Sequence, residues 1–150
     1  MIDKLEEIAR RYNNTRAFSI ISDILPPLLL IKSSMTITFE DFKKVEIRAG
    51  KILTAEKIPD TDKLLRLSVD FAEHDEAGQP TPRQIVSGIA AYFPDPTTLI
   101  GRTCMFVTNL EPRTIRGYQS NGMLFAVSDD AGNFSILEPN ASIAPGTLAK

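Results

Sequence analysis

The sequence predicts a mainly β protein, a five-stranded barrel with short helical insertions that follows a helical N-terminal extension. Three observations lead to this fold class. Apolar residues recur at helical spacing before residue 35, they alternate with polar residues from Val45 onward, and clusters of Gly, Pro and Asp separate the alternating segments. We therefore divide the chain into an extension over 1–34 and a barrel domain over 35–150.

The extension is expected to begin with an amphipathic helix. A second apolar segment over 18–25 ends at Pro26 and Pro27, because proline lacks a donor and clashes with the preceding turn. The stretch 32–34 then has the composition of a linker. Four roles stay open for the extension: a docking arm, a dimer element, an upstream extension, or a helix packed on its own barrel. The apolar face of the first helix consists of Ile2, Leu5, Ile8 and Tyr12.

The barrel strands are recognised by period-two alternation. The first is expected from Val45, with Gly50 allowing the bend that coils a long strand around a small barrel. After a turn over 59–62, the clearest strand runs over 65–71, and a solvated loop over 73–82 follows. Helical turns are expected within 88–100. Further strands are predicted over 83–87, 103–110, 123–128 and 134–137. Five or six short strands with one helical interruption after the third favour a closed barrel of the OB kind.

Charge and cysteine content exclude several classes of protein. With 17 Lys and Arg against 19 Asp and Glu, the net charge is -2 and the pI is about 5.4, so a general nucleic-acid coat is excluded and any RNA site must be a local patch. The single cysteine, Cys104, cannot form an intrachain disulfide, which favours a reducing compartment and the cytoplasm. We find no transmembrane or targeting segment.

No catalytic, metal or cofactor site is expected. His74 lies in an acidic loop where a solvated side chain is the simplest interpretation, and Cys104 alternates with apolar neighbours as a core residue does. The pair Asp129 and Asp130 fits a hairpin turn better than a calcium loop. Phosphate-binding glycine motifs are absent. The sequence therefore predicts a binding protein rather than an enzyme.

Four blocks in the expected order resemble the tRNA-binding domain family. They lie over 41–52, 62–64, 83–89 and 109–124, and the resemblance covers roughly 36–150. This family includes the C-terminal part or β subunit of many methionyl-tRNA synthetases, free-standing structure-specific tRNA-binding proteins and CsaA-type chaperones. The resemblance implies an OB barrel that recognises tRNA by shape, commonly as a homodimer, either alone or with an aminoacyl-tRNA synthetase. A CsaA-like export chaperone that binds unfolded peptide is the alternative.

Candidate tRNA contacts are residues that offer positive charge or neutral hydrogen-bonding groups. Arg113 and Arg116 suit phosphates, and Ser87, Asn109 and Ser120 suit sugar or base edges. Each residue also has a structural interpretation, Asn109 as a turn residue, Ser120 as a turn cap and the arginines as solvated side chains. The wider positive surface would include Lys43, Lys44, Arg48, Lys51, Lys57, Lys63 and Arg66, of which Lys51 and Lys63 are the strongest candidates.

Two positions depart from the family pattern. Glu111 stands where relatives usually carry a lysine, and Ala91 stands where a basic or polar residue is frequent before Tyr92. Both changes remove positive charge near the expected site, so they favour weaker tRNA binding or a different partner.

Overall fold

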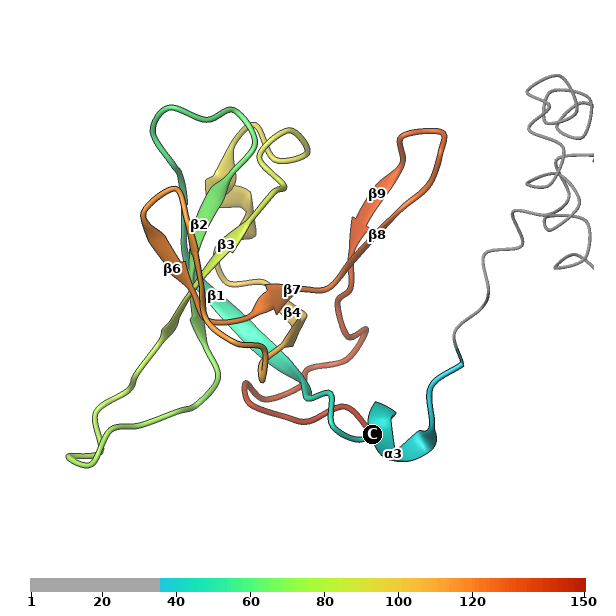
Figure 1. Cartoon of the computed structure of the whole chain (residues 1–150). Helices are drawn as coiled ribbons and strands as arrows, with labels where there is room; N and C mark the ends of the chain where they lie inside the picture. The colour runs from blue at the N-terminus through green and yellow to red at the C-terminus, as the bar shows by residue number, and fades with distance from the viewer. Residues whose placement is uncertain (1–35) are drawn as a thin grey trace, which may run out of the picture. The chain divides into compact units, whose positions relative to one another are not determined.

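The computed structural model describes residues 36–150, and the helices expected over 1–34 lie outside the described residues. Residues Phe39–Lys150 form one compact unit dominated by strands (Figure 1). Its helical segments are α3 (Phe39–Phe42) and the 3₁₀ turn η2 (Pro96–Leu99). The strands are β1 (Ile47–Lys57), β2 (Leu65–Asp70), β3 (Arg83–Ser87), β4 (Thr103–Val107), β5 (Arg113–Ile115), β6 (Tyr118–Ser120), β7 (Met123–Leu124), β8 (Ala126–Ser128) and β9 (Phe134–Ile136).

A five-stranded antiparallel sheet in the order β3-β2-β1-β4-β7 forms a nearly closed barrel (Figure 1). The long strand β1 serves both halves, since Ile47 to Lys51 pair with β4 and Lys51 to Lys57 pair with β2. A register shift between Ile52 and Thr54 lets β1 bend from one partner to the other. The predicted OB-type barrel is confirmed.

The core lies inside this sheet because alternate strand residues point inward. In β2 the apolar residues Leu65, Leu67 and Val69 are fully buried, as their alternation predicted. The rings of Phe71 and Phe106 meet edge to face with their centroids 5.4 Å apart. The remaining fully buried large side chains are Ile52, Ile85, Leu99 and Cys104.

Gly50 is required for close packing rather than for a turn. A Cβ at this position would lie 2.5 Å from Cε1 of Phe71 and 2.6 Å from Cγ1 of Val69. A register shift, a feature that bends a strand, lies two to four residues after Gly50 in β1. The absence of a side chain at Gly50 therefore lets Phe71 and Val69 pack directly against the main chain of β1.

The chain after β4 differs in detail from the predicted strands. The strand expected over 103–110 ends at Val107, and the next residues lead into a β5–β6 hairpin that the alternation did not reveal. The strand expected over 123–128 is divided at Phe125, because β7 pairs with β4 whereas β8 pairs with β9. The main chain of Phe125 instead donates to Met105 and accepts from Leu137.

The two predicted loops are confirmed as connections between antiparallel strands. Residues 73–82 join β2 to β3, and Asp75 accepts hydrogen bonds there from the amides of Ala77 and Gln79. At the β8–β9 turn, the Asp129 carboxylate accepts from both the main chain and the side chain of Asn133. Within 36–150, no helix is long and apolar enough to cross a membrane.

Replacing Gly50 with alanine is expected to destabilise the fold by about 1–3 kcal/mol, because the new methyl overlaps Phe71 and Val69 in a packed core. Gly88→Ala is the control, since a Cβ at Gly88 meets nothing within 4 Å. Urea unfolding of both variants measures the free-energy change. Equal stability of the two variants would show that the core accommodates the methyl group.

Candidate nucleic-acid interface

The β5–β6 hairpin presents two arginines on a tight turn. Ile115 pairs with Tyr118 across the hairpin, and the residues between them, Arg116 and Gly117, have φ of 51° and 84°. Positive φ at both central positions is the geometry of a type I′ turn, which matches the twist of the flanking strands. Arg116 therefore lies exposed at the tip, and Arg113 is exposed on β5.

The positive charges that the sequence suggested separate into paired and unpaired groups. Within 36–150, five candidate cations form no ion pair, namely Lys51, Lys57, Lys63, Arg113 and Arg116. The others are matched by nearby carboxylates: Lys43 with Glu40, Lys44 with Asp41, Arg48 with Glu46, and Arg66 with Glu56. Acidic side chains therefore neutralise four of the basic ones, and fewer basic side chains are available to phosphates than the sequence suggested.

Ser120 joins the hairpin to the edge strand β3. Its hydroxyl oxygen accepts a hydrogen bond from the Val86 amide at 3.0 Å and donates one to the Gly122 carbonyl at 3.1 Å. Two further hydrogen bonds involve Gln84. Its side chain donates to the Gln119 carbonyl, and its main-chain carbonyl accepts from the Asn121 amide. Ser120 is only 5% exposed, so its hydroxyl serves the closure of the barrel.

The side chain of Asn109 also bonds within the fold. Its carbonyl oxygen accepts from the Glu46 amide at 2.9 Å, and its NH₂ group donates to the Lys44 carbonyl. Asn109 thus fixes the exit of β4 against the segment that leads into β1. Ser87, at the end of β3, is half-buried, and its hydroxyl makes no hydrogen bond within the described part of the chain.

The predicted site residues fall into separate places. Arg113 pairs with Ser120 across the hairpin, Arg116 occupies its tip, and Ser87 follows the strand to which the hairpin is bonded. Lys51 lies in β1 between β2 and β4, and Lys63 precedes β2. Among residues 36–150, no hydrogen bond or ion pair joins either lysine to the hairpin.

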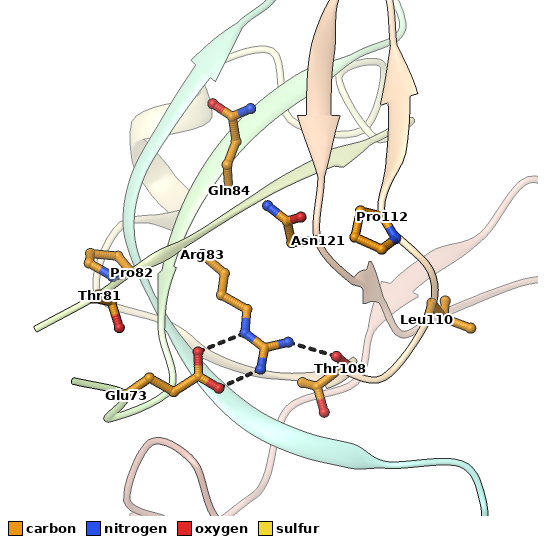
Figure 2. A pocket seen from close by; sticks show the side chains of 9 residues that line it. All are labelled: Glu73, Thr81, Pro82, Arg83, Gln84, Thr108, Leu110, Pro112 and Asn121. Carbon is orange, nitrogen blue, oxygen red and sulfur yellow. Dashed lines mark hydrogen bonds and ion pairs between the residues drawn. The ribbon is translucent and has the colours of Figure 1, made fainter. Parts of the chain in front are cut away.

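A pocket of about 510 Å³ opens between β3, the β2–β3 loop and the β4–β5 loop. Figure 2 shows the Arg83 guanidinium held by both carboxylate oxygens of Glu73 and by the Thr108 carbonyl, the last at 2.6 Å. The hydrogen bond to Glu73 raises the pKa of Arg83 above its usual value. The remaining lining residues are Thr81, Pro82, Gln84, Leu110, Pro112 and Asn121.

Sequence reasoning missed this pocket and its main polar residues. Arg83 begins a predicted strand and lies in the block 83–89 that also carried the resemblance, but it was not among the candidate contacts, and the loop containing Glu73 was expected to be solvated. Asn121 lies within the block 109–124 that carried the resemblance, so a signal was present there. No sequence pattern predicted the pairing of Arg83 with Glu73, because it depends on how β2 and β3 pair and on the path of the loop between them.

Apolar side chains gather where α3 meets the C-terminal segment. Phe39 is 68% exposed, Phe42 53%, and Val45 and Leu148 44% each. They surround a second pocket of about 410 Å³. Main-chain hydrogen bonds hold the C-terminal segment along the start of β1, including one from the Ala149 amide to the Ile47 carbonyl. We call Phe39, Phe42, Val45 and Leu148 the apolar patch.

The described residues offer little for catalysis or metal binding. No group of three or more His, Cys, Asp or Glu side chains that could hold a metal ion occurs within 36–150. Cys104 is fully buried, and burial raises the pKa of its thiol to about 12, so the reactive thiolate is scarce at neutral pH. His74 is exposed in its loop.

Comparison with known proteins gives one family and consistent relatives. Residues 47–148 match the family model described as "Putative tRNA binding domain". The chain is 41% identical over 121 residues to a methionine–tRNA ligase of Azoarcus sp., a match that covers 79% of this chain. It spans only 17% of the length of that ligase.

Solved structures agree with this assignment. A MetRS related protein from Pyrococcus horikoshii superposes with a TM-score of 0.67 at 31% identity, covering 77% of this chain and 98% of that one. The chaperone CsaA from Bacillus anthracis superposes with a TM-score of 0.63 at 29% identity, covering 77% of this chain and 99% of that one.

Ser120→Ala is expected to lower the free energy of unfolding by about 1–3 kcal/mol, because the buried Val86 amide loses its acceptor. Ser128→Ala is the matched control, since that serine is exposed and its hydroxyl makes no hydrogen bond among the described residues. Urea unfolding of both variants checks this. Wild-type stability of Ser120→Ala would mean that the hairpin is held by other contacts.

Proposed function

This chain belongs to the tRNA-binding domain family, and we propose that it binds tRNA by shape and backbone rather than by base sequence. The observation that carries the proposal is the pair of exposed arginines, Arg113 and Arg116, on a hairpin whose main chain is fixed to the barrel. Neither arginine has a carboxylate partner within 36–150, so both are available to phosphate oxygens.

The charge distribution favours selective over general RNA binding. A net charge of -2 opposes the non-specific attraction that a basic protein exerts on any polyanion. Unpaired cations at a few positions favour only an RNA whose phosphates match them in space. Lys51 and Lys63 would extend the contact beyond the hairpin, and the free hydroxyl of Ser87 would contact a sugar.

Homodimer formation is part of the proposal and rests on the apolar patch. Four large side chains are exposed together there, and such a patch marks an interaction surface more often than free surface. Pairing two copies through it would double the number of hairpins available to one tRNA. Two linked sites raise the overall affinity without any new contact.

We propose a non-catalytic module that acts with a methionyl-tRNA synthetase or alone. The similar ligases contain this domain as a small part of a longer chain, since the present chain spans 17% of the ligase from Azoarcus sp.. The proposal includes a separate extension over 1–34 ahead of the barrel over 35–150, with the extension a candidate for docking. A reducing compartment such as the cytoplasm suits the buried, unpaired Cys104.

A chaperone that binds unfolded peptide is the second candidate function. It is motivated by the similarity to CsaA from Bacillus anthracis and by the exposed apolar patch. Suppression of aggregation of an unfolded client at stoichiometric ratios, measured by light scattering, distinguishes this function from tRNA binding.

The double variant Arg113→Ala/Arg116→Ala is expected to weaken tRNA binding and to flatten its salt dependence. Each lost phosphate contact should reduce the slope of log affinity against log salt by roughly 0.7–0.9. Titration of bulk tRNA at several salt concentrations measures both quantities. Lys44→Ala is the control, because Lys44 is already paired with Asp41. An unchanged slope in the double variant contradicts the assignment of the hairpin.

Phe42→Asp is expected to convert a dimer into a monomer, because a carboxylate in a buried apolar interface is strongly unfavourable. Ile100→Asp is the control, since Ile100 is similarly exposed, at 49%, but lies outside the apolar patch. Sedimentation velocity of the full chain reports the mass of each variant. If Phe42→Asp stays dimeric, the interface lies elsewhere, and if the wild type is monomeric, the dimer proposal fails.

A further inference from the structure

We propose that the pocket between β3 and the β4–β5 loop receives an unpaired nucleotide of the tRNA, with the Asn121 side chain bonding to the edge of its base. The inference rests on the tRNA binding proposed above and adds a second kind of contact to it. The hairpin arginines would hold phosphates, and this pocket would hold a base.

The pocket has the volume that a base requires, and it is open to solvent. Its volume of about 510 Å³ is within the range of small-molecule sites, which is roughly 300–1,000 Å³. Figure 2 shows Pro82 on one side of Arg83 and Leu110 and Pro112 on the other, and all three contribute apolar surface to the pocket lining. Leu110 is 47% exposed, so a ligand there would cover apolar surface that now faces solvent.

Asn121 supplies the hydrogen-bonding group that faces this space. Its side-chain amide makes no hydrogen bond within 36–150, whereas the amides of Gln84 and Asn109 are engaged. The main chain of Asn121 is fixed by its hydrogen bond to the Gln84 carbonyl, 2.9 Å long. A carboxamide offers a donor and an acceptor side by side, which complements the edge of a base.

The electrostatics of the pocket favour a base over a phosphate. Arg83 is the cation lining it, and both oxygens of Glu73 and the Thr108 carbonyl already bind that guanidinium. The ion pair leaves the pocket close to neutral, so a phosphate would gain little attraction there. Pro112 in the pocket wall is followed directly by Arg113, which has no ion pair among residues 36–150. Arg113 lines a neighbouring pocket, and Leu110 lines both pockets.

This arrangement predicts a preference for RNA that has unpaired bases. Proteins that read bases in RNA act mainly on loops, bulges and single-stranded ends, where the base is free of its partner. A tRNA has such regions, and a continuous duplex has none. The Asn121 contact should therefore contribute to tRNA binding and leave duplex binding unchanged.

The test compares wild type and Asn121→Ala for binding to tRNA and to a blunt RNA duplex with as many phosphates. The expected result is about a tenfold loss of tRNA affinity, the size of one or two lost hydrogen bonds to a base edge, with duplex affinity and salt slope unchanged. Asn121→Asp, which keeps the shape but removes the donor, should weaken tRNA binding at least as much. Asn140→Ala and Asn140→Asp are the matched controls, because Asn140 is exposed and does not line this pocket.

Each outcome supports or overturns the inference. If Asn121→Ala and Asn121→Asp bind tRNA as the wild type does, the base pocket is wrong although the proposed function stands. If both variants weaken tRNA and duplex binding equally, Asn121 contacts the backbone, and the base pocket is again wrong. Failure of the wild-type protein to bind tRNA at low salt would instead overturn the proposed function itself. Thermal unfolding of each variant confirms that the comparison is between folded proteins.

Discussion

The hydrogen bonds that close the barrel between the β5–β6 hairpin and β3 are the constraint on which the rest of the structure depends. β3 ends the five-stranded sheet, so its outer main-chain groups need partners that the sheet does not supply. The Ser120 hydroxyl accepts from the Val86 amide and the Asn121 amide donates to the Gln84 carbonyl, each across a separation of more than thirty residues. Because the hairpin is held there, the direction of its arginines and the shape of the neighbouring pocket are both set by barrel closure.

Ion pairing divides the basic residues of an acidic protein into structural and available groups. Arg83 and Arg102 are each held by two carboxylate oxygens, from Glu73 and Glu138 respectively, and this binding raises the pKa of both guanidinium groups. The hairpin arginines lack such partners within 36–150. A chain with a net charge of -2 can therefore offer a positive site of small extent, and this favours selectivity over strong general attraction to RNA.

The candidate site was only partly predictable from the sequence. The resemblance located the stretch 109–124, and the hairpin arginines within it are exposed. The side chains of Asn109 and Ser120, which the sequence offered for RNA contact, are both engaged within the fold. Asn121, one residue further on, lines the pocket and has a side-chain amide that makes no hydrogen bond within the described residues. Residue type and spacing cannot distinguish these cases, since hydrogen-bonding side chains serve turns and ligands equally well.

The sequence by itself determined the first three strands, the mainly β class and the family, because these depend on local alternation and on a motif that is contiguous along the chain. It also placed the loop over 73–82 and the turn at Asp129 correctly, since turn-forming residues act over a few positions. Only the tertiary structure decided which side chains remain available. The Asn109 to Glu46 bond spans 63 residues, and the pocket is formed by three segments distant in sequence. Those relations depend on how β1 bends between its two partners and how the hairpin closes the barrel, and no local pattern encodes the resulting distances.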